Sequence, residues 1–425
     1  MKTRRAENAT TRRNRPETTP AARRARVAVM TLFFSNGALF ANFVPRFPQL
    51  KDAFQLDPSG YGLVIAAFPL GAMIGGPLAG LLVRRLTSAR IAAYGTVLIG
   101  VLLFCGASLV AVSANKTGPI ATATVASFAA IYALAGATDA VVDVGQNAHG
   151  FRVQRLYGRS IVNAFHAAWS AGAMTGGLMG MAATAIGLPL GWHMGGVAII
   201  FSIVGVWAKQ RTLPGRDTVA SSPTDQPHRI NVRPWPTAVA LGTLVLLALA
   251  GSAVEDISST WSTLFMRDYL DVIPSMAASA YVCMLLFQLI GRASGDWFID
   301  RFGTQSTVLV GGILMLLGAG SIVIAPNPII TVIGFALAGF GCATTVPIAM
   351  NAADDLPGLK AGTGLTIVSW LMRIFFFAAP PLIGELVEDT SLLSAIVVLP
   401  IAGFVTILAT SVLAERQQTA AGIRN

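Results

Sequence analysis

Long apolar runs, each about the length of a membrane-crossing helix, alternate with short polar segments along most of the chain. A helix needs about 20 mostly apolar residues to cross the hydrocarbon core of a bilayer. The pattern therefore predicts an all-α membrane protein with twelve transmembrane helices. The predicted helices span residues 27–45, 61–83, 91–113, 121–145, 160–186, 190–208, 237–258, 275–298, 307–325, 329–350, 362–384 and 391–413.

Basic residues are distributed very unevenly among the segments between these runs. If both termini face the cytoplasm, the cytoplasmic segments hold 24 of the 30 Lys and Arg residues and the outer loops hold four. The other two, Arg292 and Arg373, lie inside predicted helices. Because Lys and Arg favour cytoplasmic loops, we expect a multi-pass protein of the plasma (inner) membrane with both termini cytoplasmic. Arg outnumbers Lys by 25 to 5, a bias typical of GC-rich bacterial genomes.

The composition excludes an ordinary soluble enzyme. Hydrophobic residues make up 54% of the chain and charged residues 12%, whereas a soluble domain carries about 25% charged residues. Residues 1–26 contribute +7 of the net charge of +10. We expect them to form a cytoplasmic tail that contacts anionic lipid. They contain no aromatic residues for stacking on bases, so nucleic acid is not an expected partner.

A polar stretch rich in proline and serine divides the predicted helices into six plus six. A repeat crosses this divide, because Gly76–Gly80 precedes Arg84-Arg85 and Gly291–Gly295 precedes Asp300-Arg301 at corresponding places. Two matching six-helix halves are the arrangement that an alternating-access transporter needs. The expected domains are a basic tail (1–26), an N-terminal bundle (27–208), a cytoplasmic linker (209–236), a C-terminal bundle (237–413) and a second cytoplasmic tail (414–425).

The segment Gly291–Gly303 resembles the loop motif of the major facilitator superfamily, whereas its first-half copy lacks the acid and the last glycine. Three further segments are similar to a signature of the sugar-permease-like branch of bacterial inner-membrane members: residues 139–147, 163–170 and 255–262. The resemblance implies two pseudo-symmetric six-helix bundles and a secondary transporter, commonly proton-coupled, for a small polar or anionic organic solute.

The chain departs from that branch at two positions. Thr260 stands where the branch tends to have an aspartate, and Arg373 where it tends to have an aromatic residue. Both differences alter the charge near the expected pathway, so the resemblance does not identify the substrate. Uptake is slightly favoured over two alternatives, a proton-driven exporter of drugs or secondary metabolites and a non-transporting receptor or scaffold.

Three polar residues share one face of the fourth predicted helix: Asp139, Asp143 and Asn147, spaced i, i+4, i+8. Two carboxylates placed close together can share a proton, so both acids are candidates for proton coupling. The alternative is a cytoplasmic gate in which Asp143 pairs with Arg84 or Arg85.

His166 and Glu255 are the other candidates for proton coupling. Histidine titrates near neutral pH, so His166 could relay protons with Asp139, or it could simply pack between helices. Glu255 is similar to an acid of the family and is the first choice; its alternative is a salt bridge to Arg267. We expect the neighbouring Asp256 to be a rim or capping residue.

Arg373 is placed near the middle of the eleventh predicted helix and cannot discard its charge. It could bind an anionic group of the solute bidentately or balance a carboxylate within the membrane. Other polar and aromatic side chains within the predicted helices could bind a polar solute, or could instead hold helices together. These are Asn36, Asn42, Asn147, Trp169 and Trp261.

Charged residues near the cytoplasmic ends of the second and eighth helices are expected to form a gate or structural motif. Arg292 and Asp296 are four residues apart and could pair on one helix face. The expected gate residues are Arg84, Arg85, Arg292, Asp296, Asp300 and Arg301.

Several activities lack the residues that they need. No phosphate-binding loop of the G-x-x-x-x-G-K-S/T type occurs, so ATP is not the expected energy source. The four histidines have no ligand spacing, so we expect no metal and no cofactor. The sequence shows no arrangement of a nucleophile and a base that would indicate an enzyme. The expected partners are a small-molecule substrate, protons and the lipid bilayer, and the expected state is a monomer.

Overall fold

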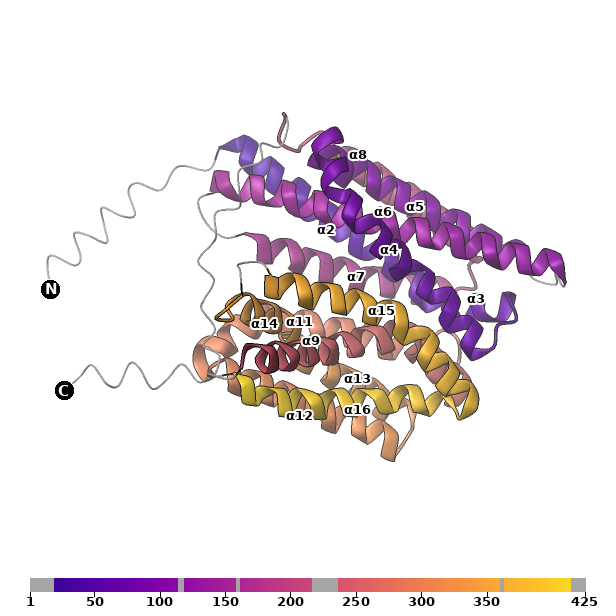
Figure 1. Ribbon diagram of the computed structural model, residues 1–425. Coiled ribbons are helices and arrows are strands. Elements are labelled where there is room, and N and C mark those ends of the chain that lie inside the picture. The colour runs from indigo at the N-terminus through magenta and orange to yellow at the C-terminus, as the bar shows by residue number, and fades with distance from the viewer. Residues whose placement is uncertain (1–18, 114–117, 158–160, 216–235, 360–362, 414–425) are drawn as a thin grey trace, which may run out of the picture.

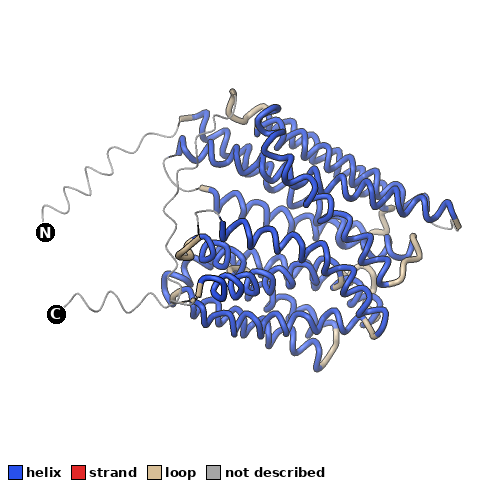
Figure 2. Tube along the Cα trace, in the orientation of Figure 1, coloured by secondary structure: helices blue, strands red, loops and turns tan. Residues whose placement is uncertain are grey.

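The computed structural model describes residues 19–113, 118–157, 161–215, 236–359 and 363–413. Within these ranges the chain is helical apart from short connections, and the long helices lie side by side (Figure 1 and Figure 2). The predicted tails 1–26 and 414–425 and the linker 209–236 fall largely outside the described residues. The all-α prediction is confirmed.

The first six-helix bundle is built from segments whose ends are fixed by local sequence signals. Thr19 caps the first helix, where its hydroxyl accepts a hydrogen bond from Ala22 N, and Asp57 caps α4; proline follows each cap. The helices are α2 (Pro20–Phe43), η1 (Val44–Arg46), α3 (Phe47–Ala53), α4 (Pro58–Leu86), α5 (Ser88–Ser113), α6 (Pro119–Tyr157), α7 (Val162–Ala185) and α8 (Leu190–Lys209).

The second bundle repeats this plan. Asn327 caps α13 and is again followed by proline. Its segments are α9 (Thr237–Thr260), α10 (Ser262–Leu264), the π-helical turn η2 (Phe265–Tyr269), α11 (Ser279–Phe302), α12 (Thr304–Ile324), α13 (Pro328–Cys342), α14 (Thr345–Asp354), α15 (Thr363–Asp389), α16 (Leu392–Ala409) and η3 (Thr410–Val412).

Twelve long helical segments are present, as the sequence predicts. Eleven of them, within the described residues, are long and apolar enough to cross a membrane; α2, η1 and α3 count as one segment, as do α13 and α14. The twelfth is α7, which has 24 residues but carries His166 and Ser170 among many Gly and Ala residues. A less apolar helix fits the position of α7, which packs against α2 of its own bundle and against α11 of the other.

Most helix ends lie within a few residues of the predicted boundaries, and two differ more. Helix α2 begins at Pro20 rather than at residue 27, so part of the predicted basic tail is helical. Helix α6 extends to Tyr157, well beyond residue 145. Both extensions are rich in polar or charged residues, which an apolar-run criterion cannot include in a helix.

Close helix packing within the bundles depends on glycine. A Cβ on Gly71 of α4 would lie 1.7 Å from the carbonyl oxygen of Ala133 in α6. Gly172 of α7 approaches the Phe34 backbone of α2 in the same way, since a Cβ there would lie 2.0 Å from its carbonyl oxygen. Small residues allow helix backbones in a membrane to come this close.

The two bundles lie side by side, with α2–α8 on one side and α9–η3 on the other (Figure 1). We call the end at which α2 begins and η3 finishes the terminal end. The opposite end, which holds α3, α10 and η2, is the distal end. Helix α4 packs against α15 and α7 against α11 across the interface between the bundles. These contacts bring the polar residues inside the bundles together.

Candidate functional site

Charged and polar side chains from both bundles meet near the middle of the helices. We call this group the central polar cluster. Its members come from α2, α6 and α7 on one side and from α9, α11 and α15 on the other. They are Asn36, Asp139, Asp143, Asn147, His166, Trp169, Ser170, Glu255, Gln288, Arg292 and Arg373.

An ion pair forms the part of the cluster that lies toward the second bundle. Glu255 Oε1 of α9 lies 2.6 Å from Arg292 Nη2 of α11, and Gln288 Nε2 donates to the same oxygen at 2.6 Å. Arg292 also donates to Ser170 Oγ of α7 at 3.1 Å, which ties the two bundles together. Both charged side chains keep about a third of their surface exposed, 33% for Glu255 and 29% for Arg292.

These partners differ from the pairings that the sequence suggested. Arg267 lies at the distal end and binds Asp52 and Asp268 instead of Glu255. Arg292 pairs with Glu255 of another helix, whereas Asp296 is exposed. Pairing between helices depends on their rotation and packing, which spacing along one helix does not report.

A second group of hydrogen bonds holds Asp139. Asn36 Nδ2 of α2 donates to Asp139 Oδ1 of α6 at 2.6 Å, and Trp169 Nε1 of α7 donates to Asn36 Oδ1 at 2.8 Å. The amide of Asn36 is therefore oriented by its two neighbours. Three helices of the first bundle are joined by this chain of two bonds.

Asp143 lies one helical turn farther toward the terminal end and is exposed. Asn147 Nδ2 donates to Asp143 Oδ1 at 2.9 Å. The charges of His166 and Arg373 also act on this carboxylate. Because Arg373 belongs to the other bundle, Asp143 faces the interface between the bundles and is reached by solvent there.

His166 lies between the two parts of the cluster. Its exposed imidazole is within electrostatic range of Asp143 on one side and Arg292 on the other. The ring also makes an edge contact with Phe33, with 5.4 Å between the ring centroids. A proton on His166 would therefore be attracted by one cluster member and repelled by another.

Arg373 of α15 reaches across the interface toward the first bundle. Its Nη1 lies 3.5 Å from the Ala72 carbonyl of α4, and a Cβ on Gly76 would lie 3.7 Å from the same nitrogen. Its charge acts on both Asp139 and Asp143. Both functions expected for Arg373, solute binding and charge balance, fit this half-buried position.

Two predicted solute-binding residues lie apart from the cluster. Asn42 is fully buried within the first bundle, where it donates to Ala38 O and lies 3.1 Å from His193 Nε2. Trp261 is fully buried at the distal end, with its ring edge-on to Tyr61. Asn42 thus joins helices inside the first bundle. Trp261 belongs to the contact at the distal end that is described next.

The distal end of the interface is closed by packing and hydrogen bonds. Tyr61 of α4 donates its hydroxyl to the Thr260 carbonyl of α9 at 2.6 Å. Gly62 lies so close to α15 that a Cβ would meet Pro380 O at 2.2 Å. We call these contacts, with Trp261 and the Arg267–Asp52 ion pair, the distal closure.

The ion pair of the distal closure lies in the connecting segments rather than in the long helices. Arg267 of η2 binds Asp52 of α3 at 2.6 Å and also contacts Asp268. Partial burial acts to lower the pKa of the Arg267 guanidinium, but its bonds to Asp268 and Asp52 outweigh this and raise it. Arg267 therefore stays charged at any physiological pH.

The predicted gate residues are separated in this structure. Arg84 and Arg85 at the end of α4 are exposed, as are Asp296, Asp300 and Arg301 around the end of α11. The hydrogen bonds and the ion pair between the bundles that are described above lie in the distal half or near the middle, as does the bond from Ser59 N to Glu388. The interface is thus closed distally, while its charged terminal rim is exposed to solvent.

Four residues in or beside these sites were missed as functional candidates in the sequence. Gln288 lies four residues before Arg292, so a polar residue on the same helix face was a usable signal. Ser170 follows Trp169 within a recognised segment. Tyr61 and the buried Asp256 had no such signal, because their positions depend on how the bundles meet.

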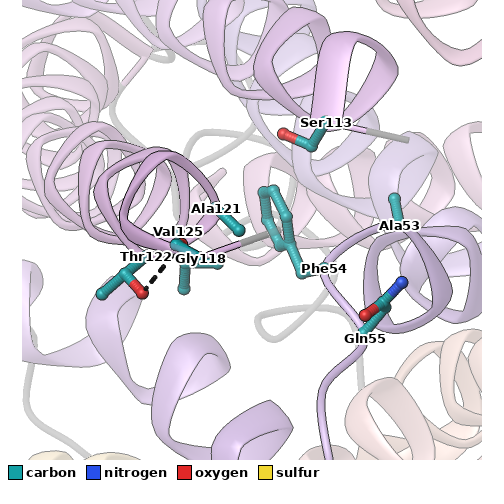
Figure 3. Close-up of a pocket in the computed structure, with 8 residues that line it drawn as sticks. All are labelled: Ala53, Phe54, Gln55, Ser113, Gly118, Ala121, Thr122 and Val125. Carbon is teal, nitrogen blue, oxygen red and sulfur yellow. Dashed lines mark hydrogen bonds between the residues drawn. The ribbon is translucent and has the colours of Figure 1, made fainter. Parts of the chain in front are cut away.

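In the described part of the chain, no group of three or more His, Cys, Asp or Glu residues could hold a metal ion. A separate pocket of about 210 Å³ opens at the distal end of the first bundle (Figure 3). Phe54, Gln55, Ser113 and Thr122 are among its lining residues. All of them belong to one bundle, so this pocket lies outside the interface that holds the cluster.

Comparison with known proteins places this arrangement in a family. Residues 29–380 match the model of the Major Facilitator Superfamily. An uncharacterized MFS-type transporter of Yersinia pestis is 25% identical over 367 residues, which cover 86% of this chain and 90% of the relative. A probable inositol transporter of Arabidopsis thaliana is 34% identical over 103 residues, 22% of this chain and 18% of the relative.

Solved structures share the fold. The crystal structure of a D-xylose-proton symporter superposes with a TM-score of 0.63 at 14% identity and covers 93% of this chain and 98% of its own. The family match and this structural likeness each cover most of the chain. The chain belongs to the major facilitator superfamily, and it is a multi-pass membrane protein of a family of solute transporters.

Proposed function

We propose that this chain is a secondary active transporter that moves a small polar or anionic organic solute across the plasma membrane by alternating access, coupled to protons. The observation that carries the proposal is the central polar cluster, to which both bundles contribute charges. A site built by two bundles changes its access when they rock about it. In this proposal the terminal end is cytoplasmic, in agreement with the distribution of Lys and Arg.

The charge balance of the cluster favours an uncharged polar solute over an anion. Three carboxylates, Asp139, Asp143 and Glu255, face two guanidinium groups, Arg292 and Arg373. Each guanidinium already lies near a carboxylate. A polyhydroxylated solute could exchange hydrogen bonds with the exposed Asp143 and its partner Asn147 without separating the Glu255–Arg292 pair. The names of the inositol and xylose transporters among the similar proteins agree with such a solute.

Proton coupling follows from the cost of charge inside a membrane, at least about 2.5 kcal/mol for an ionised group at the centre of a helix. Glu255 is held by Arg292 in this state, so it can accept a proton only when that pair separates. Asp143 is exposed and His166 is close enough to act on it. We assign Asp139, Asp143, His166 and Glu255 as the coupling residues of the cluster.

The test is proton flux in proteoliposomes that contain a pH-sensitive dye. Vesicles are challenged with myo-inositol, xylose, small carboxylates and a small cationic drug. Proton movement with a polyol or sugar supports the proposal, movement with carboxylates shifts it to an anion, and movement with the drug favours an exporter. A Ser127→Ala variant should move protons as the wild type does and is the control for substitutions in the cluster, because Ser127 is exposed and bonds only to its own helix. A folded protein that binds a solute but moves no proton would contradict coupling.

The non-transporting alternative is tested by removing residues 1–18, which precede α2. A transporter keeps its flux without this segment, whereas a receptor or scaffold that acts through the basic tail loses its cellular effect. Loss of flux in a folded, correctly oriented deletion variant would contradict the assignment of transport to the bundles alone.

A further inference from the structure

Asp256 is a buried carboxyl group that the proposed cluster does not use. Its relative exposure is 6%, and its Oδ2 is inaccessible and has no hydrogen-bond partner. Among the described residues, no donor bonds to either carboxyl oxygen. The adjacent Glu255 differs completely, because it receives hydrogen bonds from Arg292 and Gln288. The expectation of a rim or capping residue is therefore wrong for Asp256.

Part of the distal closure lies near this carboxyl. Asp256 lies one turn before Thr260, whose carbonyl accepts the Tyr61 hydroxyl. Tyr61 is within electrostatic range of Asp256, and its ring packs edge-on against Trp261 at 5.3 Å between centroids. Tyr61 and Trp261 are both fully buried. Since Tyr61 belongs to the first bundle and Asp256 to the second, separation of the bundles at this end takes the buried Tyr61 away from the surroundings of Asp256.

Other charged and titratable groups near this end are committed elsewhere. The Tyr61 hydroxyl is bonded to Thr260 O, and Arg267 is bonded to Asp52 and Asp268. From α11, Tyr281 is buried and interacts with Glu255. Helices α10 and α16 contain no charged or titratable residue. The remaining groups on elements packed against α9 are the buried or half-buried Cys283 and Cys342, the central Arg292 and Arg373, and the exposed distal acids of α15, Glu385, Glu388 and Asp389. Asp296, Asp300, Arg301 and Asp354 lie on α11 and α14 toward the terminal end.

An ionised carboxylate without a donor or cation costs several kcal/mol when it is buried. The same group costs much less to bury if it carries a proton, because it is then a neutral polar group, and it becomes ionised readily once water reaches it. The closed state must therefore hold more protons than the distally open state. By linkage, low pH then favours distal closure and high pH favours distal opening.

We infer that Asp256 is a proton-binding site of the distal closure, which takes up a proton as α4 and α9 close over it and releases it when the distal end opens. This inference rests on the proposed alternating access and assigns to it a proton site outside the central polar cluster. A proton supplied from the distal side thereby favours the state in which the cluster faces the terminal end.

The experiment measures distal opening directly and needs no solute. Spin labels are attached to Gln55→Cys and Thr390→Cys, exposed positions at the distal end of the two bundles, after the three native cysteines are replaced. The distance distribution is recorded across a pH series in lipid nanodiscs. For one linked proton, the ratio of closed to open molecules falls about tenfold per pH unit, in the pH range where the carboxyl is protonated in the closed state and ionised in the open state.

Asp256→Asn imitates the protonated carboxyl and should remain closed at every pH. Glu385→Gln is the matched control, because it neutralises an exposed acid at the same end and should keep the wild-type slope. Asp256→Glu should keep a pH response with a displaced midpoint. A wild type without pH response, or Asp256→Asn with the wild-type slope, would overturn the inference.

A second measurement covers the case in which Asp256→Asn does not fold. The infrared spectrum of the wild type at low pH should contain the carbonyl band of a buried protonated carboxylic acid, and Asp256→Glu should shift it. Absence of that band would equally overturn the inference. Solute flux without a pH response at the distal end would leave transport intact and remove only the function of Asp256.

Discussion

The two ends of the bundle interface are built differently. At the distal end, backbones of α4 and α15 are in contact, Tyr61 and Trp261 are fully buried, and a hydrogen bond joins α4 to α9. At the terminal end, the charged residues at the ends of α4 and α11 are exposed. The distal end is closed mainly by apolar packing, and the terminal end carries charges that water can solvate.

In the proposed alternating access, this difference explains how one interface can hold two states. Apolar packing stabilises contact in proportion to the area that is buried, whereas exposed charges gain little from contact unless they pair well. The stability of the distal closure therefore depends on how closely the helices fit. The stability of contact at the terminal end depends on which charges pair. The central polar cluster lies between them and is reached from the terminal side, where Asp143 is exposed.

The difference between the two ends should change most if backbone contact at the distal end is prevented. In Gly62→Ala the added methyl group would lie 2.2 Å from Pro380 O. Overpacking of this kind costs about 2–3 kcal/mol, which corresponds to a roughly 30- to 150-fold shift from closed to open molecules. Spin-label distances across the distal end measure the shift. Gly320→Ala is the control, since nothing lies near its Cβ position, and an equal shift in both variants would refute the steric explanation.

Arg292→Gln should have the next largest effect. It should lower the stability of the folded protein rather than change the opening of one end. It leaves Glu255 without its cation and removes the bond to Ser170 across the interface. We expect a loss of about 2 kcal/mol, reduced from the value for a dry pair because both side chains are partly exposed. Thermal unfolding in detergent measures it. Glu255→Gln with Arg292→Gln should recover most of the loss, and additive losses would argue against a coupled pair.

Tyr61→Phe separates the hydrogen bond of the distal closure from its packing, because it removes the hydroxyl group and keeps the ring. The Thr260 carbonyl loses its side-chain donor, which should cost about 1 kcal/mol and raise the open population roughly fivefold. The same spin labels report it. Tyr94→Phe serves as control, because Tyr94 is exposed on α5. If Tyr61→Phe has no more effect than the control, the hydrogen bond does not stabilise closure.

Arg267→Gln should have the smallest effect. Its partner Asp52 is 57% exposed, and exposed pairs contribute at most about 1 kcal/mol, less at high salt. The expected result is a small increase in distal opening at low ionic strength that vanishes in concentrated salt. An effect as large as that of Gly62→Ala would mean that charge, rather than packing, closes the distal end.

The sequence predicts the fold well because bilayer thickness sets the length of every apolar run, and the positions of Arg292, Arg373, Glu255 and Asp139 within helices follow directly. Their partners do not follow. Glu255 binds Arg292 of another helix, and this choice depends on helix rotation and on packing between distant segments. The contrast between Glu255 and Asp256 was equally hidden, since adjacent residues on a helix point about 100° apart.

The distal end was the least predictable region. Tyr61 and Gly62 lie in a predicted helix with no unusual sequence signal, and their contacts with Thr260 and Pro380 join residues about two hundred to three hundred positions apart. No periodicity along one chain segment reports such a contact. The function of Arg373 also stays a prediction, because its position fits both solute binding and charge balance.

Thiol labelling tests most directly whether the cluster is open on one side only. Asn147→Cys and Thr260→Cys are made separately in a background without native cysteines, and a polar maleimide is applied to either side of oriented vesicles. At low pH and without solute, position 147 should react rapidly from the terminal side, and position 260 should be protected from both sides. Rapid reaction at position 260, or reaction of position 147 from the distal side alone, would contradict a transporter whose distal end is closed in this state.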